Sequence, residues 1–197
     1  MVRPIDLSSL PLVRPELGIV EHGGQQTILT AAARTDAFVP PDGGAAVDRL
    51  PGLRLAPPAG PWGLALRVQP DFVAAFDAGA LVLRCDDGAW AKLAFERSPD
   101  GRPMAVSVVT RGTSDDANGP AFADRALYLR AVFTGKAHAF HTSTDGRRWE
   151  LLRFFGLPGA VTAIDIIAQS PMGDGCRVVL DQAHWITSVP GDLRDGS

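Results

Sequence analysis

The stretch from Ala80 to Ser114 constrains the fold of this chain more than any other. It contains three runs of strand-forming residues joined by two turn signals. Short runs separated by tight turns pair as antiparallel neighbours, so the stretch predicts a three-stranded meander. One face of this meander is apolar, and the other carries side chains of opposite charge. We therefore predict a β protein organised around it.

The rest of the chain supports the same fold class. Its 197 residues suit one domain, and 21 Gly with 16 Pro indicate many turns. No segment keeps a helical apolar period over three turns, whereas short strands recur at the spacing typical of a sandwich. We predict an all-β jelly-roll sandwich of two antiparallel sheets. A single domain, 1–197, is expected to comprise an irregular, proline-rich arm (1–15), the sandwich (16–189) and a frayed tail (190–197).

Alternation of apolar and polar residues locates the other strands. In the run that begins at Trp62, every second side chain is apolar, as expected for a strand with one face in a core. Residues 39–61 show no firm periodicity and are expected to form a loop. The strands expected outside the meander are 16–20, 25–32, 62–69, 127–133, 136–143, 148–155, 160–169 and 176–186.

Composition also limits the partners. A net charge of −3 without a basic cluster argues against nucleic acid, because binding phosphates needs grouped Lys and Arg. The N-terminal residues lack the apolar core of a signal peptide, and no run is long enough to span a membrane. We therefore expect a cytoplasmic protein without a membrane partner. Cys85 and Cys176 lack metal-binding spacing and are expected to be buried free thiols.

Several short motifs occur in an order that resembles a known family. They are Thr35-Asp36 followed by Phe38, Phe76-Asp77, Leu81 to Arg84, Trp90 to Glu96, Ser107 to Thr110, Ser114-Asp115, Ser143 to Gly146 with Trp149 and Arg153, and Ser170 to Gly175. Across 27–185 the chain resembles the uncharacterised family typified by the fungal regulation-of-enolase protein. The resemblance implies a concanavalin A-like lectin/glucanase jelly roll with one concave sheet, and it implies no activity.

Two positions depart from the pattern of this family. A Trp usually follows the Ser-Asp pair, where this chain has Asp116, and a Tyr usually stands at the position of Thr142. If a family site stacks a ligand on those rings, this chain lacks them.

The central strand of the meander carries the candidate binding residues. Its polar face presents Trp90, Lys92, Ala94 and Glu96. If strand order follows the sequence, neighbouring strands add Arg84, Asp86, Ser107, Arg111, Tyr128 and Arg130 to that face. Asp115, from the acidic segment 113–119, is a further ligand-binding candidate, although that segment is expected to be a solvated turn rather than a calcium loop.

This mixture suits a saccharide, because an aromatic ring receives the apolar face of a sugar while charged groups bind its hydroxyls. Our first hypothesis is therefore a non-catalytic module that binds a carbohydrate or similar polyhydroxylated molecule on the concave sheet. In the alternative structural interpretation, Lys92 and Glu96 take part in ordinary cross-strand ion pairs on an exposed sheet, and Trp90 packs under a loop.

Two further hypotheses remain open. The chain could bind a protein partner and regulate a metabolic enzyme, or it could act on a sugar as a hydrolase or isomerase, with Glu96 as acid or base and Lys92 tuning it. Glycosidases canonically need two carboxyl groups, and the chain has no Glu-x-Asp-x-Glu strand, so Asp86 or Asp115 would have to assist Glu96. We expect no cofactor and no metal site.

Overall fold

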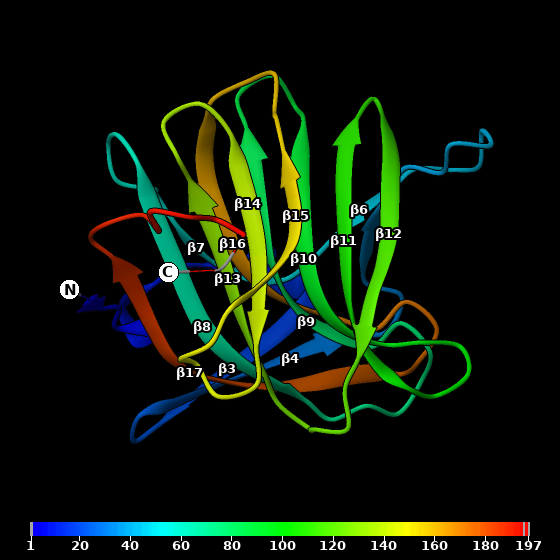
Figure 1. Ribbon diagram of the computed structural model, residues 1–197. Helices are drawn as coiled ribbons and strands as arrows, with labels where there is room; N and C mark the ends of the chain where they lie inside the picture. Colours follow the sequence, from blue (N-terminus) through cyan, green and yellow to red (C-terminus); the bar gives the residue numbers. More distant parts are fainter. Residues whose placement is uncertain (1, 195, 197) are drawn as a thin grey trace.

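The computed structural model describes residues 2–194 and 196, and two large antiparallel sheets make up most of it (Figure 1). The first sheet contains, in spatial order, β15 (Glu150–Phe155), β14 (His138–Ser143), β13 (Leu127–Phe133), β8 (Trp62–Pro70), β17 (Gly175–Ile186), β4 (Gln26–Ala32) and β3 (Gly18–Gly23), with β1 (Val2–Pro4) also paired to β17. The second contains β12 (Thr113–Ala121), β11 (Pro103–Arg111), β10 (Trp90–Arg97), β9 (Ala78–Cys85), β16 (Val161–Gln169), β7 (Gly52–Leu55) and β2 (Leu12–Val13). The all-β jelly-roll prediction is confirmed.

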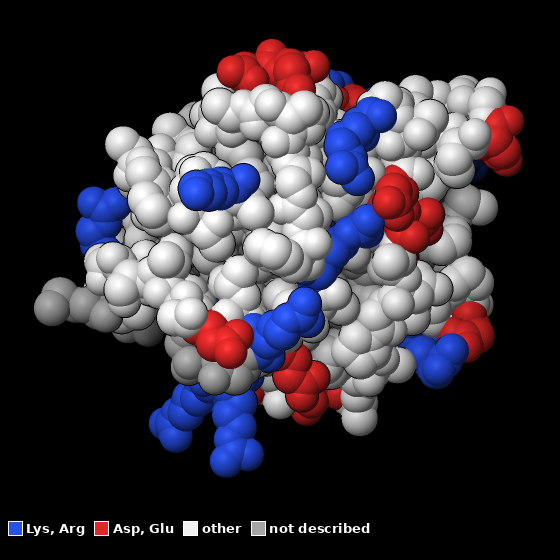
Figure 2. Space-filling view, turned by 45° about the horizontal axis from the view of Figure 1, so that its top comes forward, with Lys and Arg blue, Asp and Glu red and all other residues white. Residues whose placement is uncertain are grey.

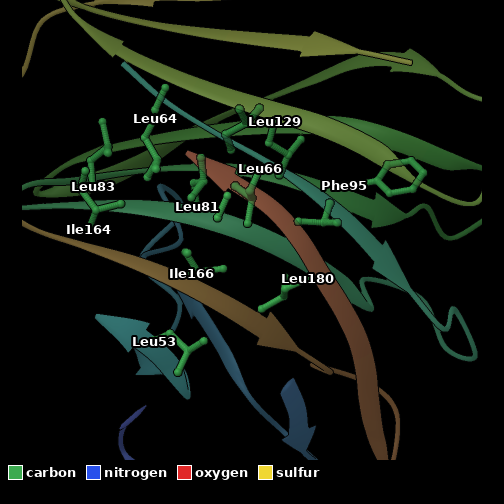
Figure 3. Packing of buried hydrophobic residues seen from close by; sticks show 14 of the residues in the cluster. Leu53, Leu64, Leu66, Leu81, Leu83, Phe95, Leu129, Ile164, Ile166 and Leu180 are labelled. Atoms are coloured by element: carbon green, nitrogen blue, oxygen red, sulfur yellow. The ribbon is translucent and has the colours of Figure 1, made fainter. Parts of the chain in front are cut away.

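The core lies between the two sheets and follows from the alternation in the sequence. Successive strand residues point to opposite faces, so every second side chain enters the space between the sheets. Figure 3 shows leucines of both sheets meeting there with Ile164, Ile166 and Phe95. The labelled side chains are almost completely buried: Leu53, Leu64, Leu66, Leu81, Leu83, Phe95, Leu129, Ile164, Ile166 and Leu180.

The predicted meander is present as β9, β10 and β11. Lys92 of β10 lies opposite Val82 of β9 and Val108 of β11, so these side chains share the face turned away from the core. Trp90, Ala94 and Glu96 point the same way as Lys92, because they are separated from it by even numbers of residues.

A small hairpin covers this outer face. It consists of β5 (Asp36–Phe38) and β6 (Val47–Arg49), and it lies beside β11 and β12 in Figure 1. A second hydrophobic cluster fills the space between hairpin and sheet; it includes Ala37, Leu50, Trp90 and Ile167. The expectation that residues 39–61 form a loop is wrong, because β6 and β7 lie there and are too short to show a period.

The ends of the chain also differ from the expectation. The arm holds β1 and β2, which pair with β17 and β7, and a short 3-10 turn, Leu7–Ser9. A second 3-10 turn, Pro15–Leu17, begins at the last residue of the arm. Proline is tolerated in such peripheral strands, where fewer backbone donors are needed. In the tail, Leu193 and Gly196 contact the first sheet through their carbonyl oxygens. Residue 1 of the arm and residues 195 and 197 of the tail lie outside the described residues.

The acidic segment 113–119 belongs to β12 and is not a turn. It pairs along β11 at the edge of the second sheet. Polar and charged residues are common on edge strands, where they discourage further strand pairing. Sequence patterns could therefore not distinguish this strand from a solvated turn.

Cys85 and Cys176 are free thiols, and both are buried. Burial raises the pKa of Cys85 to about 11 and also raises the pKa of Cys176. Within residues 2–194 and 196, no helix has the length and apolar character needed to cross a membrane.

Candidate functional site

A pocket of about 300 Å³ opens on the outer face of the second sheet, beside the β5–β6 hairpin. Strands β10, β11 and β12 form its floor and one wall, and the hairpin, the loop before β9 and the end of β16 form the rest. It is lined by Asp36, Phe38, Phe76, Lys92, Glu96, Val106, Val108, Asp116, Asn118 and Gln169.

Lys92 connects three of the segments that form the pocket, namely β10, the hairpin and the end of β16. Only 2% of this residue is exposed. Its ammonium Nζ donates to Gln169 Oε1 at 2.9 Å, to the Ala37 carbonyl at 3.1 Å and to Asp36 Oδ1 at 3.2 Å. An ammonium has three protons, so these three bonds use all its donors. Lys92 therefore fastens the hairpin to the sheet and has no proton left for a ligand.

Glu96 lies two strand repeats further along the same face, beyond Ala94, and is 8% exposed. Its Oε2 accepts a hydrogen bond of 3.3 Å from Gln169 Nε2, which also donates to the Phe76 carbonyl at 3.0 Å. Burial raises the pKa of Glu96 to about 7, and Lys92 opposes this rise while Asp36 and Asp116 add to it. Glu96 can therefore exist in both protonation states near neutral pH.

A buried hydrogen-bond network behind the pocket positions the loop that carries Phe76. Ser170 Oγ donates to Asp77 Oδ1 at 2.7 Å, and the Ser170 amide donates to Thr35 Oγ1 at 2.9 Å. The other oxygen of Asp77 accepts from the amides of residues 73 and 74. Phe76 itself has a left-handed φ of 68°, which is uncommon outside glycine and persists only where surrounding contacts enforce it. The network holds this ring at the pocket rim.

The opposite rim is fixed by Ser114 of β12. Its Oγ accepts from the Val39 amide at 2.9 Å, and its own amide donates to the Val39 carbonyl at 2.8 Å. This pairing places the end of β5, with Phe38, against β12. Asp116 and Asn118 lie opposite Val108 and Val106, so they face the pocket.

The structure brings only two of the predicted ligand-binding residues, Lys92 and Glu96, into this pocket. Trp90 lies on the same face, but it is buried in the second hydrophobic cluster and 5% exposed, so its ring is not open for stacking. Arg84 also lies on this face. Its guanidinium binds Asp48 at 2.9 Å and Asp165 at 3.2 Å, which clamps β6 onto the sheet.

The other four predicted residues lie elsewhere. Ser107 pairs with Leu93 and therefore points toward the first sheet, where Arg153 donates to it at 3.4 Å. Asp115 also pairs with Arg153, at 3.0 Å. Tyr128 and Arg130 belong to β13 of the first sheet, because the chain changes sheets after β12. The prediction placed Tyr128 and Arg130 on the wrong sheet, since alternation fixes a face within a strand but does not identify its sheet.

Arg130 contacts the C-terminal segment and the ring of Trp149. Its guanidinium donates twice to the Gly196 carbonyl, at 3.1 Å each, and lies 4.5 Å from the centre of the Trp149 ring. Burial lowers its pKa to about 10. These contacts hold the C-terminal segment on the outer face of the first sheet.

The sequence analysis did not identify most of the residues that line the pocket as candidate site residues. A signal was present for four of these side chains, because they belong to the motifs that carry the family resemblance: Asp36, Phe38, Phe76 and Val108. Gln169 directly precedes another of those motifs. Asp116 stands at the first departure from the family pattern, so this chain presents a carboxylate to the pocket where the family pattern has an aromatic ring.

A wider hollow of about 610 Å³ lies between the N-terminal segment and β4. Its buried carboxylate, Asp181, already binds Arg67 at 3.1 Å and Gln26 at 3.3 Å. No three His, Cys, Asp or Glu side chains of residues 2–194 and 196 are grouped as a metal site would need. In Figure 2, acidic and basic side chains are mixed among broad uncharged areas. We therefore take the smaller pocket as the candidate site.

Comparison with known proteins confirms the family resemblance. The family model described as "Protein of unknown function (DUF1349)" matches residues 18–187. Regulation of enolase protein 1 of Saccharomyces cerevisiae is 28% identical over 127 residues, which cover 64% of this chain and 63% of that protein. The match thus spans less than two thirds of the yeast relative.

Solved structures share the fold. The crystal structure of a functionally unknown protein from Saccharomyces cerevisiae superimposes with a TM-score of 0.83 at 23% identity, covering 94% of this chain and 100% of that one. The GH43 protein BlXynB from Bacillus licheniformis gives a TM-score of 0.62 at 12% identity, covering 85% of this chain and 38% of that one. At these identities the likeness concerns the fold alone.

Proposed function

Since this chain belongs to the family described as "Protein of unknown function (DUF1349)", whose description assigns no activity, we propose a function from the pocket itself. The protein binds a carbohydrate or a similar small polyhydroxylated molecule there, without catalysing its conversion. The observation that carries this proposal is Glu96, a carboxyl more than nine-tenths buried that lines the cavity. Within the described residues its Oε2 has a hydrogen-bond donor and its Oε1 has none.

The lining suits such a ligand. Two phenylalanine rings, Phe38 and Phe76, flank a floor that contains Val106 and Val108, so the C–H face of a sugar has apolar surface to contact. Hydroxyl groups would donate to the carboxylates of Glu96 and Asp116, and hydrogen bonds to charged groups are the stronger kind. A volume of about 300 Å³ lies at the small end of ligand pockets and fits a ligand of monosaccharide size.

Thermal unfolding tests this proposal. A saturating sugar at about 100-fold its Kd should stabilise the protein by about 2.7 kcal/mol, which corresponds to a rise in Tm of about 5–10 °C. The replacement Phe76→Ala should remove the shift, whereas Phe154→Ala, at another exposed phenylalanine on the first sheet, should retain it. A panel of mono- and oligosaccharides that leaves Tm unchanged would contradict the proposal. Sugar recovered in altered form would instead favour the hydrolase or isomerase.

A protein partner is the second candidate function, and a specific surface favours it. Val73, Phe76 and Met172 are large hydrophobic residues with exposed fractions of 76%, 37% and 67%. Their loops meet, because a Cβ built on Gly173 would lie 2.9 Å from the Cβ of Ala74. Apolar side chains grouped on a surface are typical of protein interaction sites.

The name of the yeast relative, Regulation of enolase protein 1, supports a partner of this kind and a cytoplasmic location. A pull-down with purified enolase tests it. Val73→Ser combined with Met172→Ser should abolish capture, whereas the same replacement at the exposed Ile19 of β3 should retain it.

A further inference from the structure

The polar atoms that the pocket leaves open are almost all acceptors. Lys92 donates all three of its ammonium protons to hydrogen bonds within the protein. The Gln169 side-chain amide is also engaged, since its Nε2 donates to two oxygens and its Oε1 accepts from Lys92. Among the carboxyl groups that line the pocket in the described structure, the oxygens without a protein donor are Glu96 Oε1, Asp36 Oδ2 and both oxygens of Asp116. Asn118 adds a side-chain amide that can both donate and accept. When Glu96 is ionised, a ligand must therefore supply most of the protons for hydrogen bonds in the pocket.

The charges in the pocket also favour a ligand that donates protons, and in particular a cation. Three carboxyl groups, Asp36, Glu96 and Asp116, face a single ammonium. Asp36 and Asp116 both raise the pKa of Glu96, so their negative potentials converge at that carboxyl. Lys92 lies 3.2 Å from Asp36 and offsets that one charge. A ligand anion would meet uncompensated negative charge here, whereas a cation would relieve it.

We propose that the ligand carries a protonated amine beside its hydroxyl groups, as an amino sugar does. This inference rests on the proposed function and specifies its ligand class. The ammonium lies between Glu96 and Asp116 and donates to both carboxylates. The hydroxyls donate to the remaining acceptors, and the C–H face of the ring lies against Phe38 and Phe76, whose ring faces also attract a nearby cation.

Matched sugars separate this inference from the proposed function. Titration calorimetry at pH 7 would compare D-glucosamine, D-galactosamine and D-mannosamine with the neutral parents D-glucose, D-galactose and D-mannose. D-Glucose 6-phosphate serves as the anionic probe. Each amino sugar that binds should do so about tenfold more tightly than its parent, the gain expected from a charge-assisted hydrogen bond. The phosphate ester should bind more weakly than glucose.

Two variants on one strand identify the group responsible. Asp116→Asn removes a pocket charge with little change in shape and should cancel the preference for the amine. Asp115→Asn makes the same change at the neighbouring residue, which faces the other side of the sheet and pairs with Arg153, so the preference should remain. Both residues are exposed, so neither replacement threatens folding. The converse change, Asn118→Asp, adds an acid to the pocket and should increase the preference.

The outcomes are distinct. Equal affinity for amino sugars and parents overturns the amine while leaving polyol binding in place. An amine preference that survives Asp116→Asn overturns the location, whatever its size in Asp115→Asn. Absence of binding by all seven sugars overturns both the inference and the proposed function.

Discussion

Replacing Glu96 with Gln should change how the stability of the protein depends on pH. Glu96 is a buried carboxyl whose pKa is raised from 4.5 to about 7, mainly because burial disfavours its charged form. In the folded protein it therefore keeps its proton over a range in which the unfolded chain has already lost it. The free energy of unfolding consequently falls as the pH rises from about 4.5 to 7, and this contribution levels off above 7.

The magnitude follows from the displacement of the pKa. A rise from 4.5 to about 7 costs the folded state about 3 kcal/mol once Glu96 is ionised in both states. Gln keeps the shape and can still accept from Gln169, but it does not titrate. The variant should therefore gain stability relative to the wild type as the pH rises. Most of that gain of about 3 kcal/mol should accrue between pH 5 and pH 8.

Urea unfolding of both proteins at pH 5, 6, 7 and 8 measures this difference. Other carboxyl groups also make stability depend on pH, so the informative quantity is the variant minus the wild type at each pH. Glu21→Gln, at an exposed glutamate of β3, provides the matched control and should show a flat difference. A flat difference for Glu96→Gln as well would refute the raised pKa, and with it the dry environment that we assign to this carboxyl.

Three further replacements or reagents test other parts of the structure. Lys92→Met should lower the free energy of unfolding by about 3–5 kcal/mol, because it leaves the carboxylate of Asp36 and the amide of Gln169 without their buried donor. Urea unfolding measures this loss. A loss below about 1 kcal/mol would contradict the role of Lys92 in fastening the hairpin to the sheet. Asp165→Asn should cost about as much, since this 1% exposed carboxylate binds both Arg54 and Arg84, and a variant as stable as the wild type would contradict it. The buried thiols of Cys85 and Cys176 should react with a disulfide reagent at least about 100-fold more slowly in the native protein than in urea. Fast labelling of the native protein would show that the strands carrying these cysteines open locally.

The candidate site shows how far the residue pattern could lead. The alternation of β10 placed Lys92 and Glu96 together on its polar face, because a strand sends alternate side chains to opposite sides. The same pattern could not show that this face is covered. Both the binding hypothesis and the exposed ion-pair alternative expected an open surface, whereas Lys92 is 2% and Glu96 8% exposed beneath the β5–β6 hairpin.

The partners of these residues come from distant parts of the chain. Asp36 and Gln169, which hold Lys92, are 56 and 77 residues away from it. No local rule pairs such positions, and the four misplaced residues illustrate the same difficulty. Tyr128 and Arg130 alternate correctly within β13, yet that strand belongs to the first sheet.

The sequence alone determined which residues form most of the strands and which side of each strand is apolar. That information is local, because an alternating pattern and a turn signal depend only on neighbouring residues. The tertiary structure decided which strands share a sheet, which outer face the hairpin covers and therefore where a pocket forms. Those features depend on packing between segments far apart in the chain, where burying apolar surface and pairing charged groups select one arrangement from many that the same strands would permit.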